Sequence, residues 1–208
     1  MTELQRKQAI LEKLSEMYPE AKAELQFSNP YEMLMATMLS AQCTDRQVNR
    51  VTPAVFARYP DPLAMAEARE EELYSMVKSC GFRSKAGNMI AACRIIRDRY
   101  NGQVPQERET LTSLPGVGRK TANVVLFNAF GIPAFAVDTH VFRVCNRLGL
   151  CTAKKPEETE KEVTQLIPQE QWGQAHHWLI WHGRRICKAQ KPLCKECPLN
   201  RLCKYAND

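Results

Sequence analysis

Apolar residues recur at helical spacing along nearly the whole chain, and this periodicity limits the possible folds more than any other feature. In residues 3–18 the apolar positions form one stripe: Leu4, Ile10, Leu11, Leu14 and Met17. Residues 33–39 are apolar on every side, which predicts a buried helix. Since no segment alternates apolar and polar residues as a half-buried strand does, we predict an all-α chain of roughly ten short helices.

Capping residues predict where several helices begin. Asn29 before Pro30 predicts an N-cap and a first helical position, with Glu32 completing a capping box. Asp61 and Pro62 repeat the same start. After a polar stretch at 40–45 we expect a helix broken near Pro53. Further helices are expected at 84–100, 107–113, 119–130, 139–148, 156–167 and 170–186, with an extended segment at 133–137.

The composition is that of a soluble globular protein. The 208 residues are 44% hydrophobic and 25% charged, and no apolar run reaches the length that spans a membrane. The first residues resemble neither a signal peptide nor a transit peptide, so we expect an intracellular protein.

Positive charge is concentrated at the C-terminal end. Residues 181–208 hold seven Lys and Arg and two acidic residues, a net charge of +5 out of +6 for the whole chain. Such a basic patch is typical of a protein that binds a polyanion. A solvated basic tail is the alternative, which the cysteines between these charges disfavour.

The stretch "LPGVGRKTA" at 114–122 predicts a tight turn between two helices. Exposed backbone N–H groups at Gly116, Val117 and Gly118 and at the helix start that follows can hold a phosphate oxygen. Arg119 and Lys120 place two cations at that start, where the helix dipole disfavours positive charge. A glycine-rich turn alone is weak evidence, but this order of residues indicates contact with a nucleic-acid backbone.

Lys120 has the features of an amine nucleophile. A lysine must lose its proton to attack, and the helix N-terminus, the neighbouring Arg119 and partial burial each lower its pKa. Asp138, in "VDTHV" at 137–141, follows after one helix and a turn. Taken alone Asp138 is a helix N-cap; taken with Lys120 it is a carboxylate that faces a reacting centre.

Four cysteines near the C-terminus have the spacing C-x6-C-x2-C-x5-C: Cys187, Cys194, Cys197 and Cys203. In an intracellular protein such a cluster indicates metal ligands rather than disulfides. The spacing alone leaves zinc, the default, and an iron–sulfur cluster open. The other five cysteines are expected to be buried free thiols.

In order along the chain, six motifs together resemble the endonuclease III branch of the helix-hairpin-helix DNA glycosylases. They are "LSAQCTDRQVN" (39–49), "GFRSKA" (81–86), "LPGVGRKTANVVL" (114–126), "VDTHVFRVCNRLGL" (137–150), "HHWLIWHGRRIC" (176–187) and the four-cysteine loop.

The resemblance implies two helical domains that flank a DNA-binding cleft. One is a six-helix domain at 23–133 that carries the helix-hairpin-helix; the other combines residues 1–22 with 134–208. It also implies that the four cysteines bind a [4Fe–4S] cluster, in place of the zinc default. Lys120 and Asp138 would then face each other at the domain boundary.

The activity implied by the resemblance is that of a bifunctional DNA N-glycosylase and abasic-site lyase in base excision repair. Lys120 would displace an oxidised pyrimidine from duplex DNA and form a Schiff base, and β-elimination would then cut the strand. Asp138 would stabilise positive charge on the sugar and help to activate the amine. The protein would be a monomer in the bacterial cytoplasm, associated with the nucleoid and with no membrane partner.

A flipped base leaves a gap in the duplex, and family likeness assigns Gln42 and Phe82 to fill it. Many relatives carry leucine where Phe82 stands, which puts opposite-base preference in question. His140, Arg184 and Lys191 are further candidate DNA contacts. Without the resemblance, Gln42 would be a loop residue and Phe82 a core residue. A packing role is equally open for His140, and we expect His176, His177 and His182 to be packing residues.

Two alternatives to this function are open. The same enzyme class could act on pyrimidine dimers, mismatched pyrimidines or abasic sites only. A non-catalytic helix-hairpin-helix protein would bind DNA through the same backbone contacts and give Lys120 no chemical role.

Overall fold

The computed structural model describes residues 1–207; Asp208, the last residue of the expected cluster domain, lies outside the described residues. Residues 1–207 form helices and no strand, so the all-α prediction is confirmed. The chain divides into two compact units, Met1–Lys22 with Pro133–Asp208 (unit 1) and Ala23–Ile132 (unit 2). None of the helices within residues 1–207 is long and apolar enough to cross a membrane.

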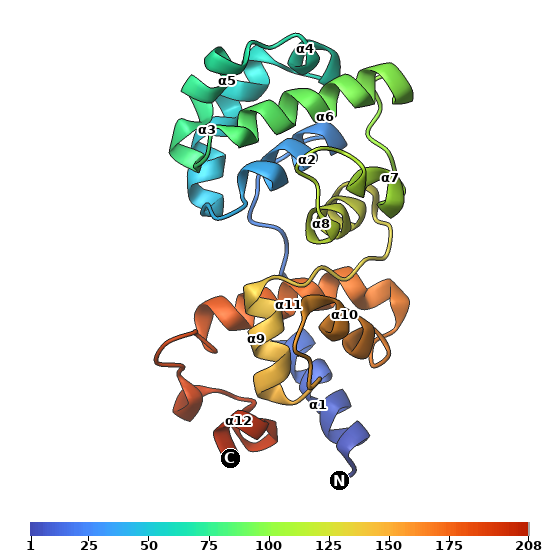
Figure 1. Ribbon diagram of the computed structural model, residues 1–208. Helices are drawn as coiled ribbons and strands as arrows, with labels where there is room; N and C mark the ends of the chain where they lie inside the picture. Colours follow the sequence, from blue (N-terminus) through green and yellow to red (C-terminus); the bar gives the residue numbers. More distant parts are fainter. Residues whose placement is uncertain (208) are drawn as a thin grey trace. The chain divides into compact units, whose positions relative to one another are not determined.

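Unit 2 is built around α2 (Pro30–Leu39), which is buried on nearly every side (Figure 1). A helix that is apolar all round needs neighbours all round. Three helices pack on it: α3 (Asp45–Arg58), α6 (Ser84–Tyr100) and α8 (Arg119–Phe130). The shorter helices α4 (Pro62–Ala66) and α5 (Glu70–Val77) pack on α6, and α7 (Arg108–Thr112) packs on α8.

The predicted helix starts in unit 2 hold, with one correction. The side chains of Asn29 and Asp61 accept the N–H groups of Glu32 and Ala64 at 2.9 and 2.8 Å. The Glu32 carboxylate, however, accepts the N–H and hydroxyl of Ser28 at 2.7 and 2.8 Å. It is therefore not available for the N-cap N–H, and the expected capping box with Asn29 does not form.

The expected break at Pro53 was wrong, because α3 runs through this proline without interruption. A proline removes one helical N–H and crowds one carbonyl. Pro53 lies on the exposed face, while Val48, Thr52 and Val55 on the opposite face are buried. Packing of that buried face keeps the two halves of the helix aligned.

Unit 1 has a core made by three helices: α1 (Glu3–Met17), α9 (Thr139–Leu148) and α11 (Trp172–Arg185). Ile10, Leu14, Val144 and Leu179 are fully buried between them. α10 (Pro156–Thr164) packs on α9 and ends earlier than expected, and α11 begins after the 3-10 turn η2 (Gln169–Gln171). Two further 3-10 turns, η3 (Cys194–Glu196) and η4 (Asn200–Leu202), lead to α12 (Lys204–Asn207).

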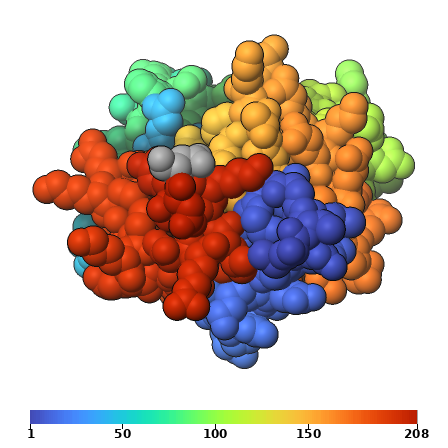
Figure 2. Space-filling model, turned by 90° about the horizontal axis from the view of Figure 1, so that it is seen from below, coloured from blue at the N-terminus to red at the C-terminus, as the bar shows by residue number. Residues whose placement is uncertain are grey.

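The two ends of the chain lie side by side in unit 1. Figure 2 shows the first helix, in blue, against the last residues, in red. Arg6 donates to the carbonyls of Leu148 and Leu202 at 2.8 and 2.6 Å, and Lys204 forms an ion pair with Glu3 at 2.9 Å. These contacts fasten the C-terminal segment to α1.

Candidate functional site

The turn between α7 and α8 is a compact hairpin whose apolar residues point inward. Leu114 and Val117 are buried, and the Val117 N–H donates to the Leu114 carbonyl at 3.1 Å. The Val117 side chain is thus buried and its N–H is paired within the turn, so the expectation of an exposed N–H at this residue is corrected. Gly118 is the N-cap of α8 and offers no side chain to cap its first N–H groups. Those N–H groups form the positive end of the helix dipole, a ready anion site.

The two glycines of this turn have different reasons to be glycine. Gly116 has a φ of +76°, and a Cβ there would lie 2.9 Å from Asn88 and 3.1 Å from Met38. The fold itself therefore requires Gly116. Gly118 has a φ of −92° and open space around its Cβ position. Nothing within 4 Å of that position requires glycine at 118.

Lys120 is the second residue of α8, directly after Arg119, and its side chain is exposed. The partial burial that we expected from the sequence is absent. The two features that remain are the helix N-terminus and the neighbouring guanidinium of Arg119.

Asp138 is the N-cap of α9, and its Oδ1 accepts the Val141 N–H at 2.8 Å. The structural role expected for this aspartate is therefore real. His140 follows in the first turn, where its Nδ1 lies 3.2 Å from Arg143. Burial lowers the pKa of His140, and the nearby Asp138 opposes this shift. His140 and Asp138 thus share one helix start in unit 1, while Lys120 belongs to unit 2.

Gln42 and Phe82 lie on two exposed turns of unit 2. Gln42 has a left-handed backbone with a φ of +55°. Phe82 is 67% exposed, so it is not the core residue that its type alone would predict. Gly81, with a φ of +117°, turns the chain directly before it.

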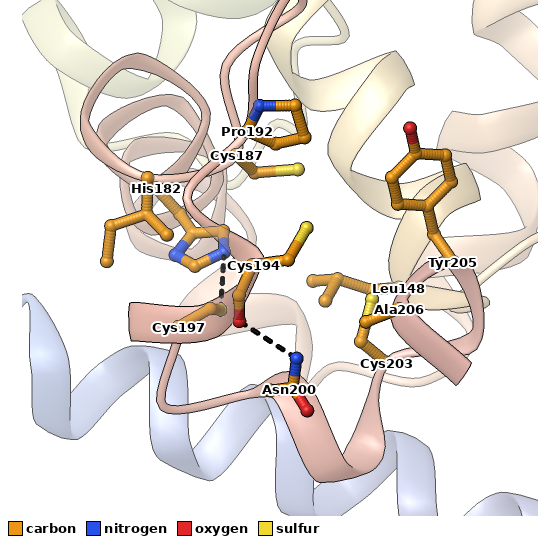
Figure 3. A pocket seen from close by; sticks show the side chains of 11 residues that line it. Leu148, His182, Cys187, Pro192, Cys194, Cys197, Asn200, Cys203, Tyr205 and Ala206 are labelled. Atoms are coloured by element: carbon orange, nitrogen blue, oxygen red, sulfur yellow. Dashed lines mark hydrogen bonds between the residues drawn. The ribbon is translucent and has the colours of Figure 1, made fainter.

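The four clustered cysteines line one pocket, as Figure 3 shows. Cys187 follows α11, Cys194 begins η3, and Cys197 and Cys203 each end a 3-10 turn. Apolar atoms make up most of the remaining wall, with Leu148, Ile186, Pro192 and Ala206 among them. Burial raises the pKa of the Cys197 and Cys203 thiols, so a bound metal would have to displace their protons.

Two residues that the sequence analysis did not assign to the cysteine site belong to it. His182 lines the pocket, with its Nε2 3.7 Å from the Cys197 sulfur and its Nδ1 3.1 Å from the Tyr18 hydroxyl. Arg147 lies 3.7 Å from the Cys187 sulfur and donates to the Lys188 carbonyl at 2.7 Å. The signal for His182 is its place five residues before Cys187. Arg147 is far away in sequence.

The basic residues around this segment differ in what they contact. Arg185 stacks on the Trp181 ring at 3.8 Å from its centroid, so its guanidinium already has a partner. Arg184 is half-buried, whereas Lys191 is exposed and has a left-handed backbone with a φ of +48°. Of the two candidate DNA contacts in this segment, Lys191 is the more open to an outside anion. Of the five other cysteines, four are buried as expected, but Cys43 is partly exposed.

Comparison with known proteins decides the family. Residues 35–169 match the HhH-GPD superfamily of base excision DNA repair proteins. The endonuclease III of Synechocystis sp. is 50% identical over 97% of this chain and 93% of its own length. That of Escherichia coli (strain K12) is 47% identical over 94% and 93%. The chain belongs to the endonuclease III family.

A solved structure of this family confirms the fold at the level of the whole chain. A trapped covalent intermediate between endonuclease III and DNA, the estranged-adenine complex, superposes with a TM-score of 0.95 at 46% identity. The match covers 100% of this chain and 98% of that chain. The family resemblance found in the motifs is thereby confirmed, and this endonuclease III family member is a DNA glycosylase with abasic-site lyase activity.

Proposed function

We propose that this chain excises oxidised pyrimidines from duplex DNA, with Lys120 as the nucleophile, and then cuts the strand by β-elimination. One observation carries the proposal: the start of α8 combines uncapped backbone N–H groups with an exposed lysine in a single turn. The N–H groups suit a phosphate of the DNA backbone. Lys120 is within two residues, along the chain, of the groups that would bind this phosphate.

The covalent step begins with the neutral amine of Lys120. Its nitrogen lone pair forms a bond to C1′ of the damaged nucleotide, and the bond from C1′ to the base breaks. The base leaves with the bonding electrons and takes up a proton, while the nitrogen loses one. Opening of the sugar ring gives a Schiff base, loss of a C2′ proton expels the 3′ phosphate oxygen, and water releases the lysine.

Asp138 is the proposed acidic partner of Lys120. Its carboxylate would stabilise the positive charge that develops on the sugar as the base leaves, and would accept a proton from the amine. One oxygen of Asp138 is already engaged in the cap of α9. The cap therefore fixes the orientation of the carboxylate and leaves the second oxygen for chemistry.

Flipping a damaged base out of the duplex costs a few kcal/mol, roughly, and leaves a gap. We assign Gln42 to hydrogen-bond the base opposite the gap and Phe82 to wedge between stacked pairs. Both side chains are exposed in the free protein, as insertion requires. His140, Arg184 and Lys191 are proposed as backbone contacts, which would make binding dependent on salt.

We propose that the cysteine pocket holds a [4Fe–4S] cluster through Cys187, Cys194, Cys197 and Cys203. The four thiols line one pocket, yet no group of three or more His, Cys, Asp or Glu within residues 1–207 converges as ligands of one ion do. A single zinc needs all its sulfurs at about 2.3 Å from one point. A cluster presents a separate iron to each thiolate, so the pocket fits a cluster better.

A cluster bound there would supply four iron–thiolate bonds that hold the C-terminal segment in shape, and base removal needs no step through it. The purified protein is expected to be yellow-brown, with iron and inorganic sulfide in equal amounts. Cys197→Ser should lose the colour and lower the unfolding temperature. A colourless protein that contains zinc would contradict the cluster.

Borohydride trapping tests the catalytic proposal. Borohydride reduces a Schiff base to a stable adduct, so the protein and a duplex with an oxidised pyrimidine should form a covalent complex. Lys120→Gln should abolish it. The matched control is Arg119→Gln, which removes a charge from the position directly before Lys120. It should weaken DNA binding, but the protein that does bind should still form the covalent complex. Equal trapping by Lys120→Gln would favour the non-catalytic alternative.

A panel of defined lesions tests the substrate class. Single-turnover release of oxidised pyrimidines should exceed that of pyrimidine dimers and mismatched pyrimidines. Cleavage at abasic sites alone, without base release, would limit the activity to the lyase step. We propose that the protein acts as a monomer on DNA in the cytoplasm.

A further inference from the structure

Lys85 lies at the start of α6 and reaches back to two turns that are far apart in sequence. Its ammonium donates to the carbonyls of Leu39 at 2.8 Å, Ala41 at 2.5 Å and Cys80 at 2.5 Å. Leu39 ends α2 and Cys80 ends the 3-10 turn η1 (Lys78–Cys80). Lys85 therefore binds the carbonyl ends of two helical segments at once.

An ammonium group is required to make all three bonds. It has three N–H donors, and each has one carbonyl acceptor here. A neutral amine has only two donors. Helix C-termini carry partial negative charge, so a cation is also electrostatically favourable at this point. Burial lowers the pKa of Lys85, and the neighbouring Cys43 and Cys80 thiols oppose that shift.

Gly81, next to the Lys85 ammonium, has a backbone conformation that favours glycine. Gly81 has a φ of +117°, a conformation that side chains rarely adopt, and a Cβ there would lie 3.4 Å from the Lys85 nitrogen. A residue other than glycine would be strained at this φ, whereas its Cβ would only reach van der Waals contact with the Lys85 ammonium. The glycine turn thus directly follows the Cys80 carbonyl that Lys85 binds.

Two further contacts hold the same pair of turns together. The Gln47 side chain donates to the Ser79 hydroxyl at 2.8 Å. The thiols of Cys43 and Cys80 are also in contact, and burial with this contact raises the pKa of Cys80 to about 11. These contacts join the segments around residues 40–47 and 79–81 to each other, and Lys85 bonds to both of them.

We propose that Lys85 is a positioning residue that fixes the spacing between Gln42 and Phe82 before they enter the duplex; the inference rests on the insertion role proposed for those two side chains. Gln42 directly follows the Ala41 carbonyl that Lys85 binds, and Phe82 is two residues after the Cys80 carbonyl. Side chains that are held in place before binding need not be ordered during base flipping. Lys85 touches neither the lesion nor the sugar in this scheme.

The variant Lys85→Met removes the ammonium and keeps a side chain of similar length. Single-turnover excision from a duplex should fall by about tenfold to about a hundredfold, the range expected when reacting groups are misplaced. Strand cleavage at an abasic site in a single-stranded oligonucleotide should be unchanged, because no paired base has to be displaced. The matched control is Lys78→Met, which removes an exposed charge from the same segment and should leave both rates unchanged.

A second background separates positioning from general damage. In Gln42→Ala/Phe82→Ala there are no insertion side chains left to position, so adding Lys85→Met should cause no further loss. If Lys85→Met lowers the rate by the same factor in both backgrounds, or lowers duplex excision and single-strand cleavage equally, the proposal is overturned. If Lys85→Met does not fold, Gly81→Ala disturbs the same turn and must give the same pattern.

Failure of the underlying function would look different. Loss of borohydride trapping in the unmodified protein would refute the role of Lys120 and say nothing of spacing. If trapping is intact and Gln42→Ala/Phe82→Ala excises as fast as the unmodified protein, insertion itself is refuted, and the role of Lys85 with it.

Discussion

The two residues proposed to carry the chemistry both stand at helix starts. Lys120 occupies the second position of α8, where the dipole disfavours its charge, and Asp138 is the N-cap of α9, where the dipole favours it. Because Lys120 is exposed in the free protein, desolvation of its amine has to come from bound DNA.

Asp138→Asn should separate catalysis from folding. Asparagine caps a helix about as well as aspartate, so the unfolding temperature and DNA affinity should change little. Base excision should fall by about 10²- to 10⁴-fold, because the amide can neither accept a proton nor stabilise positive charge. The measurements are single-turnover excision, DNA affinity and thermal unfolding.

Asp138→Ala is the control for the cap. It should lose a similar amount of activity and also about 1 kcal/mol of stability. A fall in DNA affinity by Asp138→Asn that matches its loss of excision would make Asp138 a structural residue only.

At the scale of elements, the hairpin between α7 and α8 assigns its two glycines to different tasks. Gly116 packs against α2 and α6 through Met38 and Asn88, and its positive φ excludes most other residues. Gly118 borders open space at the helix start. One glycine therefore serves the fold, and the other is proposed to contact the DNA backbone.

Gly116→Ala should mainly lower stability, and Gly118→Ala should mainly lower DNA affinity. Gly116→Ala is expected to lower the free energy of unfolding by about 1–3 kcal/mol, because the new methyl meets Asn88 and Met38 at a strained backbone position. Gly118→Ala should cost less than about 1 kcal/mol of stability. It should nevertheless weaken DNA binding, because the methyl keeps the phosphate from the backbone.

Urea denaturation and DNA titration at several salt concentrations measure both effects. The control is Gly131→Ala, at the C-cap of the same helix, which should lower stability and leave DNA affinity unchanged. An unchanged DNA affinity of Gly118→Ala would argue against a phosphate at this turn.

Sequence patterns predict local features better than contacts between distant segments. The N-caps at Asn29, Asp61 and Asp138 follow from residue type and spacing, and so does the hairpin. The continuous helix through Pro53 does not, because packing of its buried face outweighs the local rule. Nor does the role of Lys85, since its partners are backbone carbonyls, which every residue has.

At the scale of the whole chain, Arg6 joins the beginning to the end. It donates to Leu148, Gly149 and Leu202 carbonyls at 2.8, 2.8 and 2.6 Å and is itself held by Glu3. This arginine supports both α9 and the last cysteine turn. The four-cysteine spacing predicts the ligands, but it does not predict the two contributions of α9, namely Leu148 in the pocket wall and Arg147 beside the Cys187 sulfur.

Arg6→Ala should lower the free energy of unfolding by about 2–4 kcal/mol, because it leaves several partly buried carbonyls without their charged donor. Lys13→Ala, an exposed change on the same helix, should cost less than about 1 kcal/mol. Urea denaturation measures both. Equal, small losses from the two variants would show that the C-terminal segment holds its place without Arg6.

Identifying the residue that becomes bonded to DNA tests the role of Lys120 most directly. The protein is trapped with borohydride on a duplex that carries an oxidised pyrimidine, digested with a protease and a nuclease, and the modified peptide is sequenced by mass spectrometry. We expect the sugar remnant on Lys120. A remnant on another lysine or on the N-terminal amine, with Lys120 unmodified, would contradict the mechanism.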